Sequence, residues 1–150
     1  MKKILLGILL GILLLLSINS FGQITKIENE KSIASTRISP MGIFLIGANI
    51  FENRVNVSFT DTKYTTIKIY KNFNLSPKDF EDLYLLLTKE DNKEEDFYNI
   101  KTLDEKQLFI KFSKSFGVVY PIIMLTDSGV DSFVAYLTKS QIKKLFNKNK

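Results

Sequence analysis

Apolar and polar residues alternate along three stretches of the chain, and this two-residue period predicts half-buried β-strands. The stretches cover residues 54–59, 66–70 and 107–113. Within the third, Leu108, Ile110 and Phe112 form the predicted buried side, while Phe109 breaks the alternation. We therefore expect each stretch to have one face against a core and one face toward solvent.

Two longer stretches, residues 42–51 and 118–125, are apolar on both faces. This pattern favours strands placed centrally or beneath helices. Pro121 has no backbone N–H to give to a neighbouring strand, so it predicts an edge or a bulge there. The Asp-Ser-Gly sequence at 127–129 predicts a hairpin turn before another strand at 132–137.

The apolar period changes to that of a helix in two places. Ser76 is a predicted N-cap, with Pro77 at the first helical position and Asp79 in the first turn. Thr138 and Gln141 have the spacing of a capping box. Each start is followed by an apolar stripe, made by Phe80, Leu83, Tyr84 and Leu87 in the first helix and by Ile142, Leu145 and Phe146 in the second.

These elements predict an α+β fold. We expect a mainly antiparallel sheet of about six to eight strands with two helices packed on it, in the order strands–helix–strands–helix. Residues 75–83 and 137–145 share a pattern of apolar residue, hydroxyl cap and apolar stripe. Two interpretations stay open: a duplicated unit joined near residues 91–97, or the ordinary chemistry of two strand-to-helix junctions.

The N-terminus has the pattern of a secretory signal peptide. Lys2 and Lys3 precede an uncharged run from Ile4 to Ile18, which is 15 residues long. A bilayer crossing needs about 20 residues. The best cleavage point follows Gly22, so we expect a signal peptide at 1–22 and a single α+β domain at 23–150. The alternative is an uncleaved anchor extending through Ile24.

Charge and composition limit the classes of partner that we expect for this protein. Loss of Lys2 and Lys3 with the leader lowers the formal charge from +5 to +3. Arg37 and Arg54 are the only arginines, whereas nucleic-acid binding usually depends on clustered arginine. We expect no nucleic-acid partner, and no membrane span after cleavage. The Lys-, Asn- and Ile-rich composition and the leader favour a bacterial protein in the periplasm or outside the cell.

The sequence contains no cysteine and no histidine. It therefore has no disulfide, no thiolate nucleophile and no imidazole base. Carboxylates remain as candidates for acid–base chemistry, in the loop 90–96 and at Asp104 and Glu105, although an acidic loop is typically a solvated connector. The pairs formed by Lys114 with Ser113 and Ser115, and by Lys139 with Ser140, are adjacent in sequence and are not a specific signal for a Ser–Lys dyad.

Other candidate sites are equally weak. Residues 127–132 loosely resemble an oxygen-rich calcium loop, but they lack the spacing of an EF-hand, and a hairpin turn explains them. Gly42 and Gly47 lack the signature of a phosphate-binding loop and predict bulges or close packing in a strand. Four aromatic residues near element ends either line a groove or complete the core: Tyr64, Phe73, Tyr98 and Tyr136.

From the sequence we expect an exported, non-catalytic binding or interaction domain with no cofactor, no metal site and no assigned catalytic residue. Its expected partner is a protein or another cell-envelope component. Two alternatives remain: a carrier of a small apolar ligand, and a carboxylate-based glycan hydrolase. An enclosed apolar cavity favours the carrier, two carboxylates in one cleft favour the hydrolase, and an exposed apolar patch favours the interaction domain.

Overall fold

A computed structural model describes residues 30–134 and 136–148 of the chain. The predicted signal peptide, its cleavage point after Gly22 and the alternative anchor all lie outside the described residues.

The described strands form two antiparallel sheets, each with its strands in sequence order. The first, sheet A, contains β1 (Ala34–Ile38), β2 (Ile46–Ile50), β3 (Val55–Thr60) and β4 (Tyr70–Leu75), with a 3₁₀ turn η2 (Pro40–Gly42) between β1 and β2. The second, sheet B, contains β5 (Phe97–Lys101), β6 (Gln107–Ser115), β7 (Val118–Asp127) and β8 (Val130–Val134).

One helix follows each sheet. Helix α2 (Pro77–Thr88) begins where Ser76 accepts a hydrogen bond from the Asp79 backbone N–H, as predicted. Helix α3 (Lys139–Leu145) begins with the predicted capping box between Thr138 and Gln141. The α+β class and the dominance of antiparallel sheet are thus confirmed.

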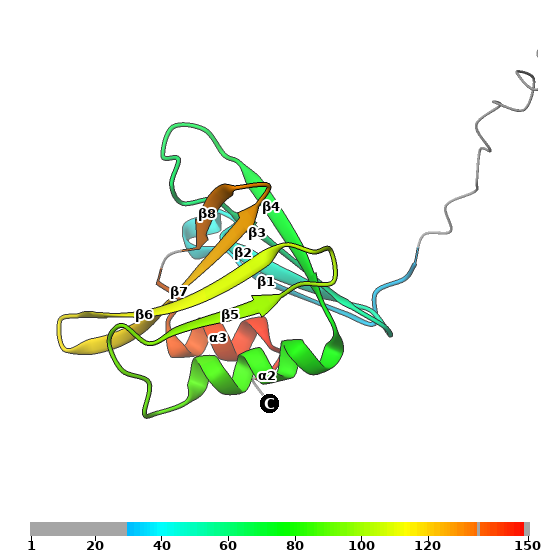
Figure 1. Cartoon of the computed structure of the whole chain (residues 1–150). Helices are drawn as coiled ribbons and strands as arrows, with labels where there is room; N and C mark the ends of the chain where they lie inside the picture. The colour runs from blue at the N-terminus through cyan, green and yellow to red at the C-terminus, as the bar shows by residue number, and fades with distance from the viewer. Residues whose placement is uncertain (1–29, 135, 149–150) are drawn as a thin grey trace, which may run out of the picture.

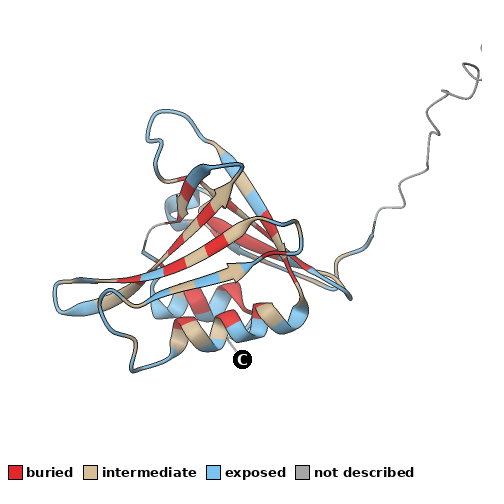
Figure 2. Ribbon diagram, viewed as in Figure 1, coloured by how far each residue is buried: buried red, intermediate tan, exposed pale blue. Residues whose placement is uncertain are grey.

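The expectation of one sheet is wrong, because the strands divide into two sheets of four. Helix α2 follows β4 directly after the Ser76 cap, and β5, the next strand, pairs with β6 and not with β4. Buried residues recur along the strands and on the helices (Figure 2), and those of both sheets and both helices belong to one hydrophobic core.

The two helices lie side by side at one end of the molecule, and the loop between β3 and β4 projects at the other end (Figure 1). Phe80 of α2 stacks on Phe146 with ring centroids 4.3 Å apart. Helix α3 packs on β1 and β2, where the Thr36 hydroxyl donates to the Leu145 carbonyl at 2.7 Å. Because α3 follows sheet B but packs on sheet A, it joins the two halves.

A polar clamp also connects the sheets. The backbone N–H of Asn74 in β4 donates to the Asp104 carboxylate at 2.9 Å, and Lys106 reaches the same carboxylate at 2.9 Å and the Asn72 carbonyl at 2.8 Å. Partial burial by itself raises the pKa of Asp104, but the hydrogen bonds from Asn74, Lys106 and Thr102 outweigh it and hold this pKa below its usual value.

Two strand predictions are wrong in the same region. Residues 66–69 do not form a strand. Strand β4 begins at Tyr70, which pairs with the last residue of β3, Thr60. Residues 42–45 precede β2 and form a connection in which Ile43 is exposed. Leu45 still bonds through its backbone to the Ile38 carbonyl at 3.0 Å and to the Thr60 N–H at 2.8 Å, whereas residues 66–68 are exposed and lie beyond the last pair of β3 and β4.

Gly42 and Gly47, both predicted to lie in a strand, have different places in the structure. Gly47 lies in β2, where a Cβ would come within 2.6 Å of the Thr36 carbonyl oxygen, so close packing is confirmed there. Gly42 lies in the 3₁₀ turn with φ of 79°, and its prediction as part of a strand is wrong.

Two further predictions about β7 are confirmed. Pro121 lies where β7 pairs with β6 alone, because the pairing with β8 starts at Ile123. Residues 128 and 129 form the turn of the β7–β8 hairpin, both with positive φ.

Candidate functional site

A groove about 450 Å³ in volume lies between the connection that follows β1 and the connection from β3 to β4. We call it the loop groove, and it is lined by Pro40, Met41, Ile43, Phe44, Leu45, Thr60, Asp61, Thr62, Tyr64, Thr65, Ile67 and Lys68. The β3–β4 loop is the segment that projects beyond the sheets at the end away from the helices (Figure 1).

The first wall of the groove is a tight turn. Pro40 begins the 3₁₀ turn, and Met41 and Gly42 continue it with φ of 51° and 79°. The Ile43 backbone N–H donates to the Pro40 carbonyl at 2.9 Å. Thr60 then fixes the end of this connection, since its hydroxyl donates to the Phe44 carbonyl at 2.7 Å. The wall is therefore tied to β3.

The second wall is anchored by a buried acid. Asp61 is 1% exposed, and its carboxylate accepts the backbone N–H groups of Lys63 at 3.0 Å and Phe133 at 3.1 Å. Thr62 adds two bonds to the Phe133 carbonyl, from its backbone N–H at 2.9 Å and from its hydroxyl at 3.0 Å. The base of the β3–β4 loop is thereby held against β8 of sheet B.

Large apolar side chains are exposed along this groove. Met41 is completely exposed, and Ile67 is 59% exposed. Of the thirteen exposed large hydrophobic residues in the described part of the chain, five are in or against the groove: Met41, Ile43, Tyr64, Ile67 and Tyr70. Contiguous exposed apolar surface marks an interaction site more often than scattered single residues do.

Three positive side chains lie in the groove or beside residues that line it. The Arg37 guanidinium lies 5.2 Å from the centre of the Phe44 ring, and the Lys63 ammonium lies 5.9 Å from the centre of the Tyr64 ring. Lys68 lines the groove itself. The one acid in segments 37–45 and 60–70 is Asp61, which is buried. The exposed charge of the two walls is consequently all positive.

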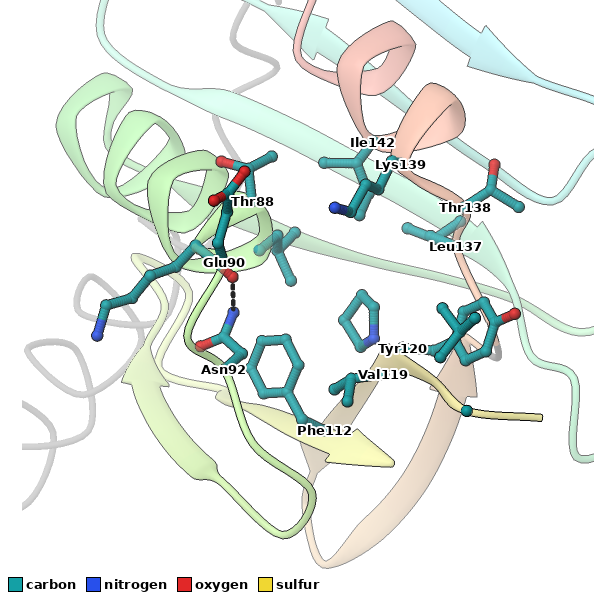
Figure 3. A pocket seen from close by; sticks show the side chains of 15 residues that line it. Thr88, Glu90, Asn92, Phe112, Val119, Tyr120, Leu137, Thr138, Lys139 and Ile142 are labelled. Atoms are coloured by element: carbon teal, nitrogen blue, oxygen red, sulfur yellow. Dashed lines mark hydrogen bonds between the residues drawn. The ribbon is translucent and has the colours of Figure 1, made fainter. Parts of the chain in front are cut away.

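A second concavity, which we call the helix–hairpin cleft, has a volume of about 520 Å³. It lies between the end of α2, the start of α3 and the β6–β7 hairpin (Figure 3). Its floor consists of core residues, namely Leu87, Phe112, Pro121, Leu137 and Ile142, and polar groups stand at its rim, among them Thr88, Glu90, Asn92, Thr138 and Lys139.

The rim of this cleft carries mixed charge. Glu90 and Lys139 extend from opposite sides toward the opening (Figure 3). Asn92 closes the end of α2 by donating to the Leu86 carbonyl at 2.8 Å and the Lys89 carbonyl at 3.0 Å, and its Oδ1 is enclosed without a partner. The cleft lining includes a single carboxylate, so it does not supply the pair that a glycan hydrolase of the expected type needs.

Most of the candidate site residues predicted from the sequence lie at different sites in the structure. Asp104 and Lys106 belong to the clamp between the sheets, and Lys139 reaches the helix–hairpin cleft. Residues 127–132 form a hairpin in which Thr126 bonds to Asp131. Among residues 30–134 and 136–148, no cluster of three or more acidic side chains is arranged to hold a metal ion.

The four candidate aromatic residues have different environments. Tyr64 lines the loop groove, whereas Phe73 is buried in the core. Tyr98 packs edge-on against Phe112, and exposed Tyr136 lies edge-on against Tyr120. The groove interpretation therefore applies to Tyr64, and the core interpretation applies to Phe73.

Sequence reasoning missed Met41, Ile43 and Ile67 as surface residues. Apolar character placed Ile43 in the predicted strand 42–51 and Ile67 in the predicted strand 66–70, and Met41 lay just before the first of these and was assigned no role. The Ser-Pro-Met-Gly sequence at 39–42 was the available signal for a turn, since proline and glycine both favour turn conformations.

Comparison with protein families, with curated proteins and with solved structures finds no match for this chain. No helix within the described ranges is long and apolar enough to cross a membrane.

Proposed function

We propose that this protein is an exported, non-catalytic binding module that attaches to a component of the bacterial cell envelope through the loop groove. The observation that carries the proposal is the exposure of Met41, Ile43 and Ile67 on walls that are themselves held in place by hydrogen bonds.

The exposed groove residues are not explained by folding. An apolar side chain contributes about 1.5–3 kcal/mol to stability only when it is removed from water. Met41 and Ile67 retain most of their exposure, so they contribute little of this. Burial against a partner would recover it.

Export rests on the predicted signal peptide at 1–22, and it places the partner in the envelope or outside the cell. The lack of cysteine and histidine removes several classes of catalytic machinery. Together with the open, apolar form of the groove, this favours binding over catalysis.

The proposal is tested by co-sedimentation of residues 23–150 with envelope fragments from a Gram-negative bacterium. The double variant Met41→Ser, Ile67→Ser removes apolar surface from both walls. The matched control is Leu103→Ser, Phe116→Ser, since both of these residues are also exposed but lie on other loops. We expect the unsubstituted chain and the control to sediment with the fragments and the groove variant to stay in solution. Equal sedimentation of all three proteins would contradict the proposal.

A second candidate function is carriage of a small apolar ligand in the helix–hairpin cleft. The observation that favours it is an apolar floor beneath a polar rim in a volume of about 520 Å³, which lies within the usual range for small-molecule sites. Native mass spectrometry of the chain purified from its source tests this function. A stoichiometric lipid or other apolar molecule, lost in a Val119→Trp variant that fills the cleft, would support the carrier over the interaction module.

We further propose that the two halves derive from one duplicated unit, because each consists of four strands followed by a capped helix. Exchange of α2 and α3 between the halves, with the flanking caps retained, tests this idea. A folded exchange variant would support a common unit, and a variant that does not fold would favour two independently evolved junctions.

A further inference from the structure

We infer that the component bound by the loop groove is the surface of a lipid bilayer that contains anionic lipids. This inference rests on the proposed function, because it names the partner of the same groove.

Charge is the first argument. Lys68 lines the groove, and Arg37 and Lys63 lie over the rings of two lining residues, Phe44 and Tyr64. The acid that belongs to its walls, Asp61, is buried and bonded to backbone N–H groups. A surface with apolar residues inside a positive border complements a bilayer, which presents anionic headgroups above an apolar interior.

The kind and position of the apolar residues is the second argument. Met41 and Ile67 are the most exposed aliphatic side chains of the two walls, and they are suited to insertion among acyl chains. Tyr64 lines the same groove, and Tyr70 packs against another lining residue, Phe44, with ring centroids 6.1 Å apart. Tyrosine is enriched at the level of the headgroups, because its ring is apolar and its hydroxyl is polar.

The hydrogen bonds already made inside the groove favour a bilayer over a protein partner. Three of the polar side chains that line the groove, Thr60, Asp61 and Thr62, already have intramolecular hydrogen bonds. Recognition of a particular protein normally adds directed hydrogen bonds across the interface. Apart from the hydroxyls of Tyr64 and Thr65, the attractions left for a partner are apolar contact and positive charge, which suit a fluid lipid surface.

The test uses purified chain 23–150 and vesicles that are free of other proteins. One set contains phosphatidylcholine with about one third phosphatidylglycerol, and the other contains phosphatidylcholine alone. Flotation with the vesicles measures the partition coefficient. We expect binding to the anionic vesicles that falls at least tenfold on phosphatidylcholine alone, and that falls strongly at about 0.5 M salt, where surface charges are screened.

Two pairs of lysine variants test the positive border. Lys63→Ala, Lys68→Ala removes two border charges, and the control Lys143→Ala, Lys144→Ala removes two exposed charges from α3. Each basic residue near an anionic surface contributes about fivefold to binding. The border variant should therefore bind about 25-fold more weakly, and the control should bind with less than a twofold change. Circular dichroism confirms that both variants are folded.

Equal binding to both vesicle types, or equal losses in the two variant pairs, would overturn the inference. Sedimentation with envelope fragments without binding to the anionic vesicles would also overturn it, and would point to a protein or glycan partner while the proposed function stands. Failure to bind either preparation would remove both the inference and the proposed function.

Discussion

The loop groove and the helix–hairpin cleft have similar volumes, about 450 and 520 Å³, yet they use apolar residues in opposite ways. In the cleft, apolar side chains such as Phe112 and Ile142 form the floor and belong to the core. In the groove, Met41 and Ile67 stand at the walls in contact with solvent. Folding explains the first set and does not explain the second, so the groove is the better indication of function.

The largest expected effect concerns the floor of the cleft. Phe112 is 2% exposed, and Phe112→Ala should lower the free energy of unfolding by about 3–5 kcal/mol, through lost burial and the cavity left behind. Urea denaturation followed by circular dichroism measures the change. A loss below about 1 kcal/mol would mean that this floor is not part of a tightly packed core, and the comparison between the two concavities would fail.

The next effect concerns the anchor of the groove. Asp61→Ala leaves the backbone N–H groups of Lys63 and Phe133 without their acceptor. The free energy of unfolding should therefore fall by about 2 kcal/mol. Asp61→Asn is the matched control, because both bonds go to the same carboxylate oxygen, Oδ1, and an amide oxygen in its place can still accept them, so the loss should be smaller. Hydrogen exchange should accelerate at the amides of residues 63 and 133 in the alanine variant. Unchanged exchange at both amides would show that Asp61 does not anchor the loop.

The clamp between the sheets should have a smaller, pH-dependent effect. Because the pKa of Asp104 is lowered in the folded protein, ionised Asp104 stabilises the fold fully above its unfolded pKa of about 3.9. That contribution is lost as the pH falls through the lower folded-state pKa. Asp104→Asn should thus lower the free energy of unfolding at neutral pH by less than Asp61→Ala does, and by progressively less below about pH 4. Urea denaturation at several pH values tests this, and a pH-independent difference would contradict the assignment.

The smallest expected change in stability belongs to the walls of the groove. Met41→Ser, Ile67→Ser should alter the free energy of unfolding by less than about 0.5 kcal/mol, since both side chains are exposed. The same urea titration applies. A loss as large as that of Phe112→Ala would place these residues in the structural core and remove the reason to treat the groove as a site.

The fold was largely predictable where local chemistry determines the structure. The caps at Ser76 and Thr138 set the helix starts, and alternation at 54–59 and 107–113 identified strands whose apolar side is buried. The division into two sheets was not predictable, because a strand pattern specifies which face is buried and not which strand lies alongside.

The groove was not predictable for a related reason. Residues 66–69 have the composition of a strand, but they lie beyond the last pair between β3 and β4, Thr60 with Tyr70. Their exposure depends on the absence of a neighbouring strand at that position, which is a property of the tertiary structure. Tyr64 was a candidate groove residue from sequence, whereas its neighbours Met41 and Ile67 were not.

The central claim is that the loop groove, and not another exposed apolar surface, contacts the envelope. The chain has no cysteine, so an environment-sensitive fluorophore can be attached at one introduced thiol, in Ile67→Cys or in the control Leu103→Cys. These positions have similar exposure, 59% and 55%. On addition of envelope fragments, we predict a blue shift of the emission at position 67 and none at position 103. No shift at 67, or equal shifts at both positions, would contradict the claim.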